Sequence, residues 1–299
     1  MHSLIALFNF EFFRNAFLAA FMASLTCGII GTYIVSRRIV FISGGITHAS
    51  FGGIGMGYYF GIDPILGAVG FGILSALGIE LFTKRANLRE DSAIAMLWSL
   101  GMALGIIFIF ITPGYAPNLM SYLFGNILTV SKNDLLFLLF LSVFTIGFFL
   151  IFYRMIIFVS FDEEFALTNN APVRLFNSLL ISLVALTIVL NIRVVGIILV
   201  MSLLTIPQAI ANLFTKRFDV MIFYSIGFGF LGSVIGLAIS YLYDIPSGTA
   251  IIFTLVVLYG FIKILFLLLG RAHPGASPVR ENSIKTEEGS KPKSLKPKA

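Results

Sequence analysis

The sequence predicts an all-α polytopic membrane protein with about nine transmembrane helices. Of its 299 residues, 58% are hydrophobic and only 11% are charged. A soluble domain is roughly 25% charged, so most of this surface must face lipid. A helix needs about 20 mostly apolar residues to cross the hydrocarbon core. Nine such stretches are present, at residues 13–36, 41–60, 64–82, 92–111, 134–153, 175–191, 194–213, 219–241 and 247–269.

The basic residues between these stretches indicate how the chain crosses the membrane. With the N-terminus outside, nine Lys and Arg residues fall in the inner connections, and only Arg14, Lys132 and Arg193 fall on the outer side. Lys and Arg are enriched in the cytoplasmic loops of membrane proteins. The sequence therefore predicts a multi-pass protein of the cell membrane (the bacterial inner or cytoplasmic membrane), with the N-terminus outside and the C-terminus cytoplasmic.

Composition divides the chain into three regions. Residues 1–12 form an N-terminal interfacial segment, residues 13–270 carry the spans, and residues 271–299 are a basic cytoplasmic tail rich in Lys, Pro, Ser and Glu. Such a tail cannot bury enough apolar surface to fold, so we expect it to be disordered. The formal charge of +6 comes from span ends and this tail. It therefore reflects membrane topology and predicts no nucleic-acid partner.

The second predicted span carries one histidine, His48, in a run of glycines. A titratable side chain is costly in lipid, so it usually faces the bundle interior or a water-filled path. Because imidazole is the commonest metal ligand, we predict that His48 lines a translocation path as a ligand or gate. The structural alternative is a buried ring bonded to a neighbouring carbonyl. Close helix packing is predicted for the glycines of this span, which are Gly45, Gly52, Gly53, Gly55 and Gly57.

The seventh predicted span contains Pro207, which removes a backbone hydrogen bond and should kink the helix. Gln208 and Asn212 follow it, four residues apart on one helix face. A kinked polar stripe is suited to lining a path, but the same side chains are equally suited to bonding neighbouring helices together. Asp244 precedes the ninth span, where we expect a turn with an N-cap role. Receiving cations at the outer mouth is its functional alternative.

The inner loop after the fifth span begins with acidic residues, as helix N-termini often do. A short helix here would suit the docking of a soluble partner, and a solvated connector on the membrane surface is the alternative. The residues that open it are Asp162, Glu163, Glu164, Phe165 and Ala166. The sequence has no Gly-x-x-x-x-Gly-Lys-[Ser/Thr] phosphate loop and no evident catalytic cluster. We therefore expect a transport subunit that is not an enzyme, with any ATPase on another chain.

Several motifs, in this order, resemble the permease subunits of zinc, manganese and iron ABC transporters. They lie at residues 37–41, 48–49, 91–105, 123–130, 161–166, 195–200, 206–207 and 244–248, within a resemblance over residues 12–270. The resemblance implies a type II-like ABC importer permease bundle. It implies a homodimer with a second copy of the chain, two ABC ATPases and an extracytoplasmic metal-binding protein, all in a lipid bilayer. It also implies a coupling helix at residues 161–174, His48 as a pathway ligand, and transported Zn, Mn or Fe instead of a resident cofactor.

One position departs from the family pattern Gly-Asp-x-x-Ser-His-Ala. Gly44 stands where the aspartate is expected, and Thr47 stands in place of the serine. A cation would then depend on His48, on unwound carbonyls or on residues from elsewhere. This keeps a permease for a metal chelate or another small solute as an alternative. An ion-coupled carrier without an ATPase is less favoured, because few intramembrane carboxylates and no clear inverted repeat are visible.

Overall fold

A computed structural model describes residues 9–85, 88–113, 125–161 and 172–269 of the chain. Within these residues every regular element is helical, which confirms the all-α prediction. The elements are α1 (Glu11–Ser36), α2 (Val40–Phe60), α3 (Pro64–Arg85), α4 (Glu90–Ile111), the 3-10 turn η2 (Ile127–Thr129), α6 (Lys132–Phe161), α8 (Val173–Val195), α9 (Ile197–Leu203), α10 (Ile206–Phe214), α11 (Phe218–Tyr243) and α12 (Ser247–Leu268).

Eight helical segments of the described chain are long and apolar enough to cross a membrane, with Ile197–Phe214 counted as one. The ninth long helix is α2, whose glycines and hydroxyl side chains dilute its apolar character. Each predicted span therefore corresponds to one long helix or, for the seventh, to the pair α9 and α10. Several helices run beyond their predicted bounds, and α6 and α8 run farthest past their predicted ends, to Phe161 and Val195.

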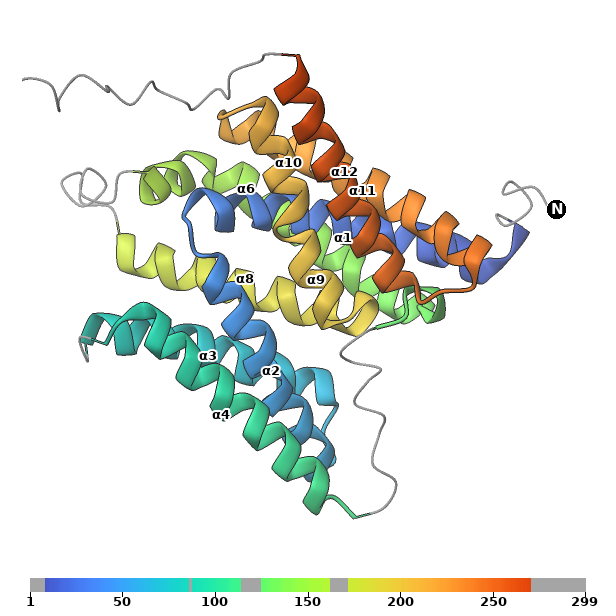
Figure 1. Ribbon diagram of the computed structural model, residues 1–299. Helices are drawn as coiled ribbons and strands as arrows, with labels where there is room; N and C mark the ends of the chain where they lie inside the picture. Colours follow the sequence, from blue (N-terminus) through green and yellow to red (C-terminus); the bar gives the residue numbers. More distant parts are fainter. Residues whose placement is uncertain (1–8, 86–87, 114–124, 162–171, 270–299) are drawn as a thin grey trace, which may run out of the picture.

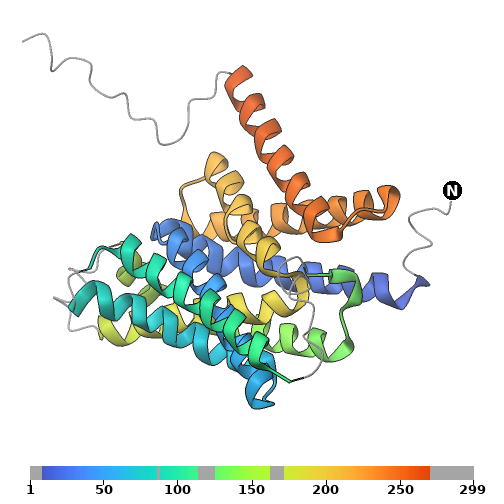
Figure 2. The same ribbon diagram turned by 60° about the horizontal axis from the view of Figure 1, so that its bottom comes forward.

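The helices form one bundle in which α1 and α8 lie at the centre (Figure 1). Helices α2, α3 and α4 pack together on one side of this centre, and α11 and α12 lie on the other. In the apolar 18-residue window of α1, 72% is buried inside the bundle, whereas only 22% of the corresponding windows of α4 and α12 is buried. The outer helices therefore offer apolar faces to lipid or to a partner. Figure 2 shows the later part of α12 standing away from the bundle.

Close backbone contacts fix α2 between α3 and α4. A Cβ atom on Gly53 would meet the carbonyl of Gly67 in α3, and one on Gly52 would lie 2.8 Å from the carbonyl oxygen of Gly101 in α4. Small residues let two helix backbones approach this closely. The other glycines singled out in this helix are also in contact: Gly45 faces Ile94, Gly55 faces Gly105 and Gly57 faces Pro64.

The seventh span is broken, which differs from the predicted kink. Helix α9 ends at Leu203, and Thr205 has non-helical dihedrals (φ −128°, ψ −49°) before α10 begins. Pro207 therefore lies in the first turn of α10, where its missing N–H removes no helical hydrogen bond. The junction before α9 is a single residue, Gly196, with φ 84° and ψ 163°. This conformation is essentially restricted to glycine, and it ends α8.

Two predicted segments lie partly or wholly outside the described residues. Between α4 and α6, the described residues include the η2 turn, which is capped by the side chain of Asn126. The expected disordered tail, residues 271–299, lies outside, and so do residues 162–171 of the predicted docking segment, residues 161–174. The ends of α6 and α8 that flank the docking segment are described, and they lie side by side at the left of Figure 1.

Candidate translocation site

His48 lies in the middle of α2 and is half-buried. Its ring stacks on the indole of Trp98 from α4, with centroids 4.1 Å apart and planes 5° from parallel. Its Nδ1 atom is buried and has no hydrogen-bond partner in the described part of the chain. Nδ1 therefore makes no bond to a neighbouring carbonyl in the described residues. The stack on Trp98 fixes the plane of the imidazole.

Polar side chains are exposed on α4 and around the end of α9. Ser99 is exposed, and Ser202 and Thr205 are partly exposed. The hydroxyls of Ser202 and Thr205 donate to carbonyls one turn earlier, Ile198 O at 3.1 Å and Met201 O at 2.8 Å. A purely lipid-facing surface would not favour such groups. This surface is thus suited to a water-filled path or to a partner subunit.

Gln208, predicted as a path residue, is fully buried. Its Nε2 donates to Cys27 O of α1 at 2.8 Å and to Leu203 O at 3.1 Å. In a continuous helix the Leu203 carbonyl would accept from residue 207, but proline has no N–H, so the Gln208 amide takes its place. These contacts are those of a bond between helices, the alternative left open by the sequence. Asn212 has other surroundings, because its Oδ1 accepts from Lys216 Nζ at 2.9 Å near the exposed end of α10.

Asp244 does not have the expected N-cap role. It is the C-cap residue of α11, exposed, in the left-handed conformation with φ 52°. The N-cap residue of α12 is Pro246, which provides no side-chain hydrogen bond. Asp tolerates the left-handed region better than most residues, which explains its place at this turn. Asp244 thus forms the turn at the end of α11. Among the described residues, it belongs to no group of three or more His, Cys, Asp or Glu that could hold a metal ion.

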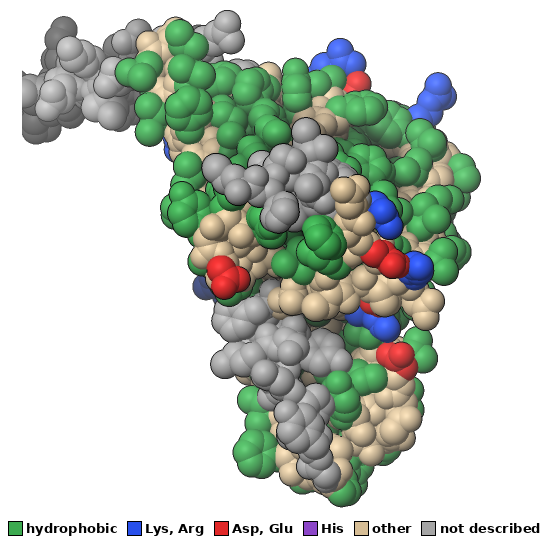
Figure 3. Space-filling view, turned by 90° about the vertical axis from the view of Figure 1, so that its right-hand side faces the viewer, with side chains coloured by type: hydrophobic (Ala, Val, Ile, Leu, Met, Phe, Trp, Pro, Cys, Tyr) green, Lys and Arg blue, Asp and Glu red, His purple; other side chains and the backbone are tan. Residues whose placement is uncertain are grey.

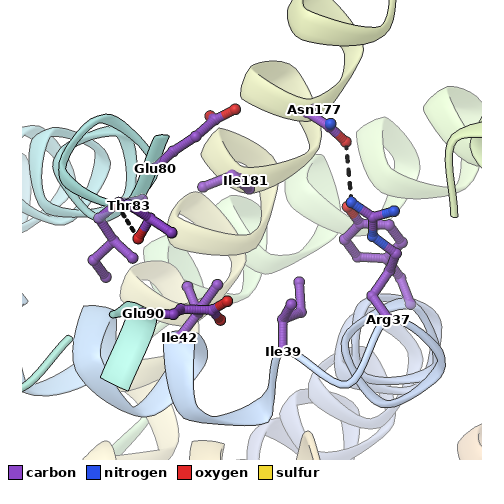
Figure 4. A pocket seen from close by; sticks show the side chains of 11 residues that line it. Arg37, Ile39, Ile42, Glu80, Thr83, Glu90, Asn177 and Ile181 are labelled. Carbon is purple, nitrogen blue, oxygen red and sulfur yellow. Dashed lines mark hydrogen bonds between the residues drawn. The ribbon is translucent and has the colours of Figure 1, made fainter. Parts of the chain in front are cut away.

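At the end of the bundle where α1 stops and α8 begins, Arg37 connects three helices. It is the C-cap residue of α1, and its Nη1 donates to Val159 O in the last turn of α6 at 2.6 Å. Its Nη2 donates to Asn177 Oδ1 of α8 at 3.5 Å. Figure 4 shows this pair at the edge of a cavity of about 140 Å³, whose lining also includes Glu80 and Glu90. Arg37 thus bonds to α6 and to α8, the two helices that flank the docking segment. That segment contains residues Asp162–Ala166. Sequence reasoning used this arginine only for topology.

At the opposite end, charged side chains gather among apolar ones (Figure 3). Arg193 of α8 pairs through Nε with Asp134 Oδ1 of α6 at 2.5 Å, and its Nη1 lies 3.9 Å from Asp63 Oδ2 in the α2–α3 connection. Lys132 pairs with Glu11 at 2.9 Å. These pairs join α1, α3, α6 and α8 at one end of the bundle. Basic residues at this end are therefore engaged with carboxylates.

The described helices form a membrane-spanning bundle with a half-buried histidine, one broken span and exposed polar side chains. This combination is typical of polytopic transport proteins. Within this class, the model of the ABC 3 transport family matches residues 9–266. The chain belongs to this family, as a membrane-spanning permease subunit. This membership gives no support to the alternative of a secondary carrier without an ATPase.

Known proteins resemble the chain over most of its length. It is 39% identical to an uncharacterized membrane protein of Synechocystis, over 87% of this chain and 92% of the relative. It is 34% identical to the manganese transport system membrane protein MntC of Halalkalibacterium halodurans, over 82% and 84%. Its structure resembles a chain of PsaBC from Streptococcus pneumoniae in complex with Fab, with a TM-score of 0.79, 30% identity and coverage of 89% and 98%. The PsaBC chain and this chain therefore share one fold over most of their length.

Proposed function

We propose that this chain is the permease of an ATP-driven ABC importer for a divalent transition metal, either zinc, manganese or iron. The observation that carries the proposal is the His48 imidazole, held by Trp98 within a span, with a buried nitrogen that has no partner. Imidazole is a ligand suited to zinc and iron. Family membership and the manganese-transport relative support a metal as the substrate. The metal is transported cargo, and its binding to the path is transient.

The proposed assembly has two copies of the permease, two ABC ATPases and an extracytoplasmic metal-binding protein. The N-terminus is outside and the C-terminus is cytoplasmic, as the distribution of basic residues favours. Residues 161–174 act as the coupling helix on the ATPase. Support comes from Arg37, which bonds to α6 and α8 on either side of this segment, so that a movement of the segment is transmitted to α1.

The proposed mechanism is alternating access. ATP binding closes the ATPase pair, the coupling helix moves, and the helices tied to it change which side of His48 is open. The break between α9 and α10 provides a place where the seventh span bends at low cost, because its freed carbonyl at Leu203 already bonds to a side chain. Gln208 acts here as a structural bridge, and His48 acts on the cargo.

Whole-cell elemental analysis tests the substrate. Cells that lack this chain and all redundant uptake systems are compared with cells that carry it, in metal-poor medium. We expect a selective loss of zinc, manganese or iron, restored by the wild-type chain and not by His48→Ala. Equal amounts of His48→Ala and wild-type protein in the membrane would establish assembly. Unchanged content of all three metals would refute the proposal, and full rescue by His48→Ala would remove His48 from the path.

The coupling role has a separate test. Replacing Glu163 and Glu164 with lysine should lower transport and the stimulated ATPase activity of the purified complex, because two charges at the docking segment are reversed. The spans should stay folded. The matched control replaces Glu90, an exposed acidic residue at the start of α4, with lysine. Normal transport and stimulation in the double variant would contradict the assignment of residues 161–174.

A further inference from the structure

Helix α9 is a seven-residue helix between two breaks in the backbone. The first break is Gly196, whose N–H donates to Ile192 O at 2.9 Å and whose carbonyl accepts from Val200 N at 3.1 Å. One residue therefore closes the last turn of α8 and opens the first turn of α9. Rotation about its N–Cα bond turns α9 against α8 without breaking either hydrogen bond, and glycine tolerates a wide range of φ. The second break is Thr205, which has non-helical dihedrals.

A second glycine with positive φ lies directly against the first break. Gly125 has φ 62°, and a Cβ atom on it would meet the carbonyl group of Val195 and the amide nitrogen of Gly196. Backbones approach this closely only where no side chain separates them. The Gly125 turn and the junction between α8 and α9 therefore pack backbone on backbone, although they are far apart in the chain.

The η2 turn that follows this glycine is held by α1. The side chain of Asn126 caps the turn, and Ile127 within it is buried in the main core. Asn15 Nδ2 of α1 donates to Val130 O at the end of the turn, at 3.4 Å. The apolar window of α1 is mostly buried inside the bundle. The turn is thus a fixed support for the junction between α8 and α9.

The other end of α9 meets α2 through a flexible side chain. Met201 Sδ lies 3.4 Å from Thr47 Oγ1, and a Cβ atom on Gly44 would lie 3.2 Å from Met201 Cε. Methionine is unbranched, so it adapts to small displacements of its neighbours. Ser202, the next residue of α9, is partly exposed. A movement of α9 would therefore change what this end of the helix presents at the surface.

We propose that Gly125 and Gly196 form a pivot, at which α9 swings against α8 during the transport cycle while η2 stays fixed on α1. The pivot rests on the proposed function, since ATP drives the swing in the assembled transporter. Gly125 acts as a positioning residue. A Cβ atom at this position would push the junction away from its support, so the swing would lose its fixed point.

The test measures distances within one chain of the complete purified transporter, by double electron–electron resonance. The single cysteine, Cys27, is fully buried, so spin labels attach to introduced cysteines. One pair, at Leu179 of α8 and Ser202 of α9, reports the swing. The reference pair joins Leu179 to Asn133, just after η2, and all three positions are at least partly exposed. Each pair is measured without nucleotide and with ATP and vanadate, in dimers with one labelled copy.

We expect ATP and vanadate to change the Leu179–Ser202 distance and to leave the reference distance unchanged. Gly125→Ala should abolish the change, and Gly61→Ala is its matched control. Gly61 also has positive φ, 68°, but nothing lies within 4 Å of its Cβ position. The two variants therefore separate the backbone contact from backbone strain. If Gly125→Ala does not reach the membrane, Asn126→Ala removes the cap of the same turn and should reduce the change.

Three results would overturn the pivot: a Leu179–Ser202 distance that is the same in both states, an equal change in the reference pair, or variants of the turn that behave as Gly61→Ala. ATP-driven uptake of Zn²⁺, Mn²⁺ and Fe²⁺, each supplied alone, is measured on the same wild-type preparation. Uptake without a distance change refutes the pivot and leaves the proposed function standing. No uptake of any of the three metals, although the ATPase is stimulated, would instead refute the proposed function itself.

Discussion

Replacing Arg37 with methionine tests whether the last turns of α1 and α6 and the first turn of α8 act as one unit. The change keeps most of the aliphatic stem and removes the guanidinium. Val159 lies in the last turn of α6, where a carbonyl has no intrahelical partner within the helix. The structure supplies that partner through Arg37 Nη1 at 2.6 Å.

The size of the effect follows from this contact. A hydrogen bond to a charged group contributes about 1.5–3 kcal/mol, and a cation at a helix C-terminus adds about 0.3–1 kcal/mol. The 3.5 Å contact with Asn177 adds little, because its donor–acceptor distance is long. We therefore expect Arg37→Met to lower the free energy of unfolding by about 2 kcal/mol.

The assay measures thermal unfolding of the purified complex, together with the number of metal ions transported per ATP hydrolysed. Arg37→Met should lower both, because the segment between α6 and α8 is no longer tied to α1. Arg38→Met is the matched control, since it removes a charge at the same end of the membrane. Equal stability and equal coupling in the two variants would show that the contact with Val159 contributes to neither quantity, and the reasoning would be wrong.

Three further predictions concern helix packing and backbone geometry, each measured by thermal unfolding in detergent. Gly67→Ala should destabilise by about 1–3 kcal/mol, because its Cβ would meet the Gly53 carbonyl. Gly70→Ala in the same helix faces open space and should be neutral or stabilising, so equal effects would refute the packing argument. Gln208→Leu should cost about 3 kcal/mol by leaving two carbonyls without a donor. Asn212→Ala should change stability by less than about 0.5 kcal/mol, and the reverse order would contradict the roles assigned to the pair. Gly196→Ala should cost about 1–3 kcal/mol at its positive φ, and an unchanged melting temperature would contradict that strain.

Much of the fold could be predicted because the length of an apolar run is a local property. Each of the nine stretches was long enough to cross a bilayer, and each became one long helix or, in one case, a pair. Helix α2 was predicted by the same criterion at residues 41–60, and it extends over Val40–Phe60. The end of α8 was predicted at residue 191, which was wrong, because the helix continues to Val195 and Gly196 ends it.

The sites were harder to predict, because side-chain partners are distant in the sequence. The order of residues showed that Gln208 follows a proline, but not that its amide reaches Cys27, 181 positions away. Likewise the bond of Arg37 to Val159 spans 122 positions. The position of Met201 beside Gly44 has no signal in the sequence, because it depends on how α9 approaches α2.

The sequence by itself determined that this chain is an all-helical membrane protein and where its spans lie, because burial in lipid is decided by composition over about 20 residues. It also placed one histidine within a span. The tertiary structure alone decided which polar side chains bond helices together, where the seventh span breaks, and that the indole of Trp98 stacks on His48. Those outcomes depend on the approach of helices far apart in the chain, and close approach is fixed by packing.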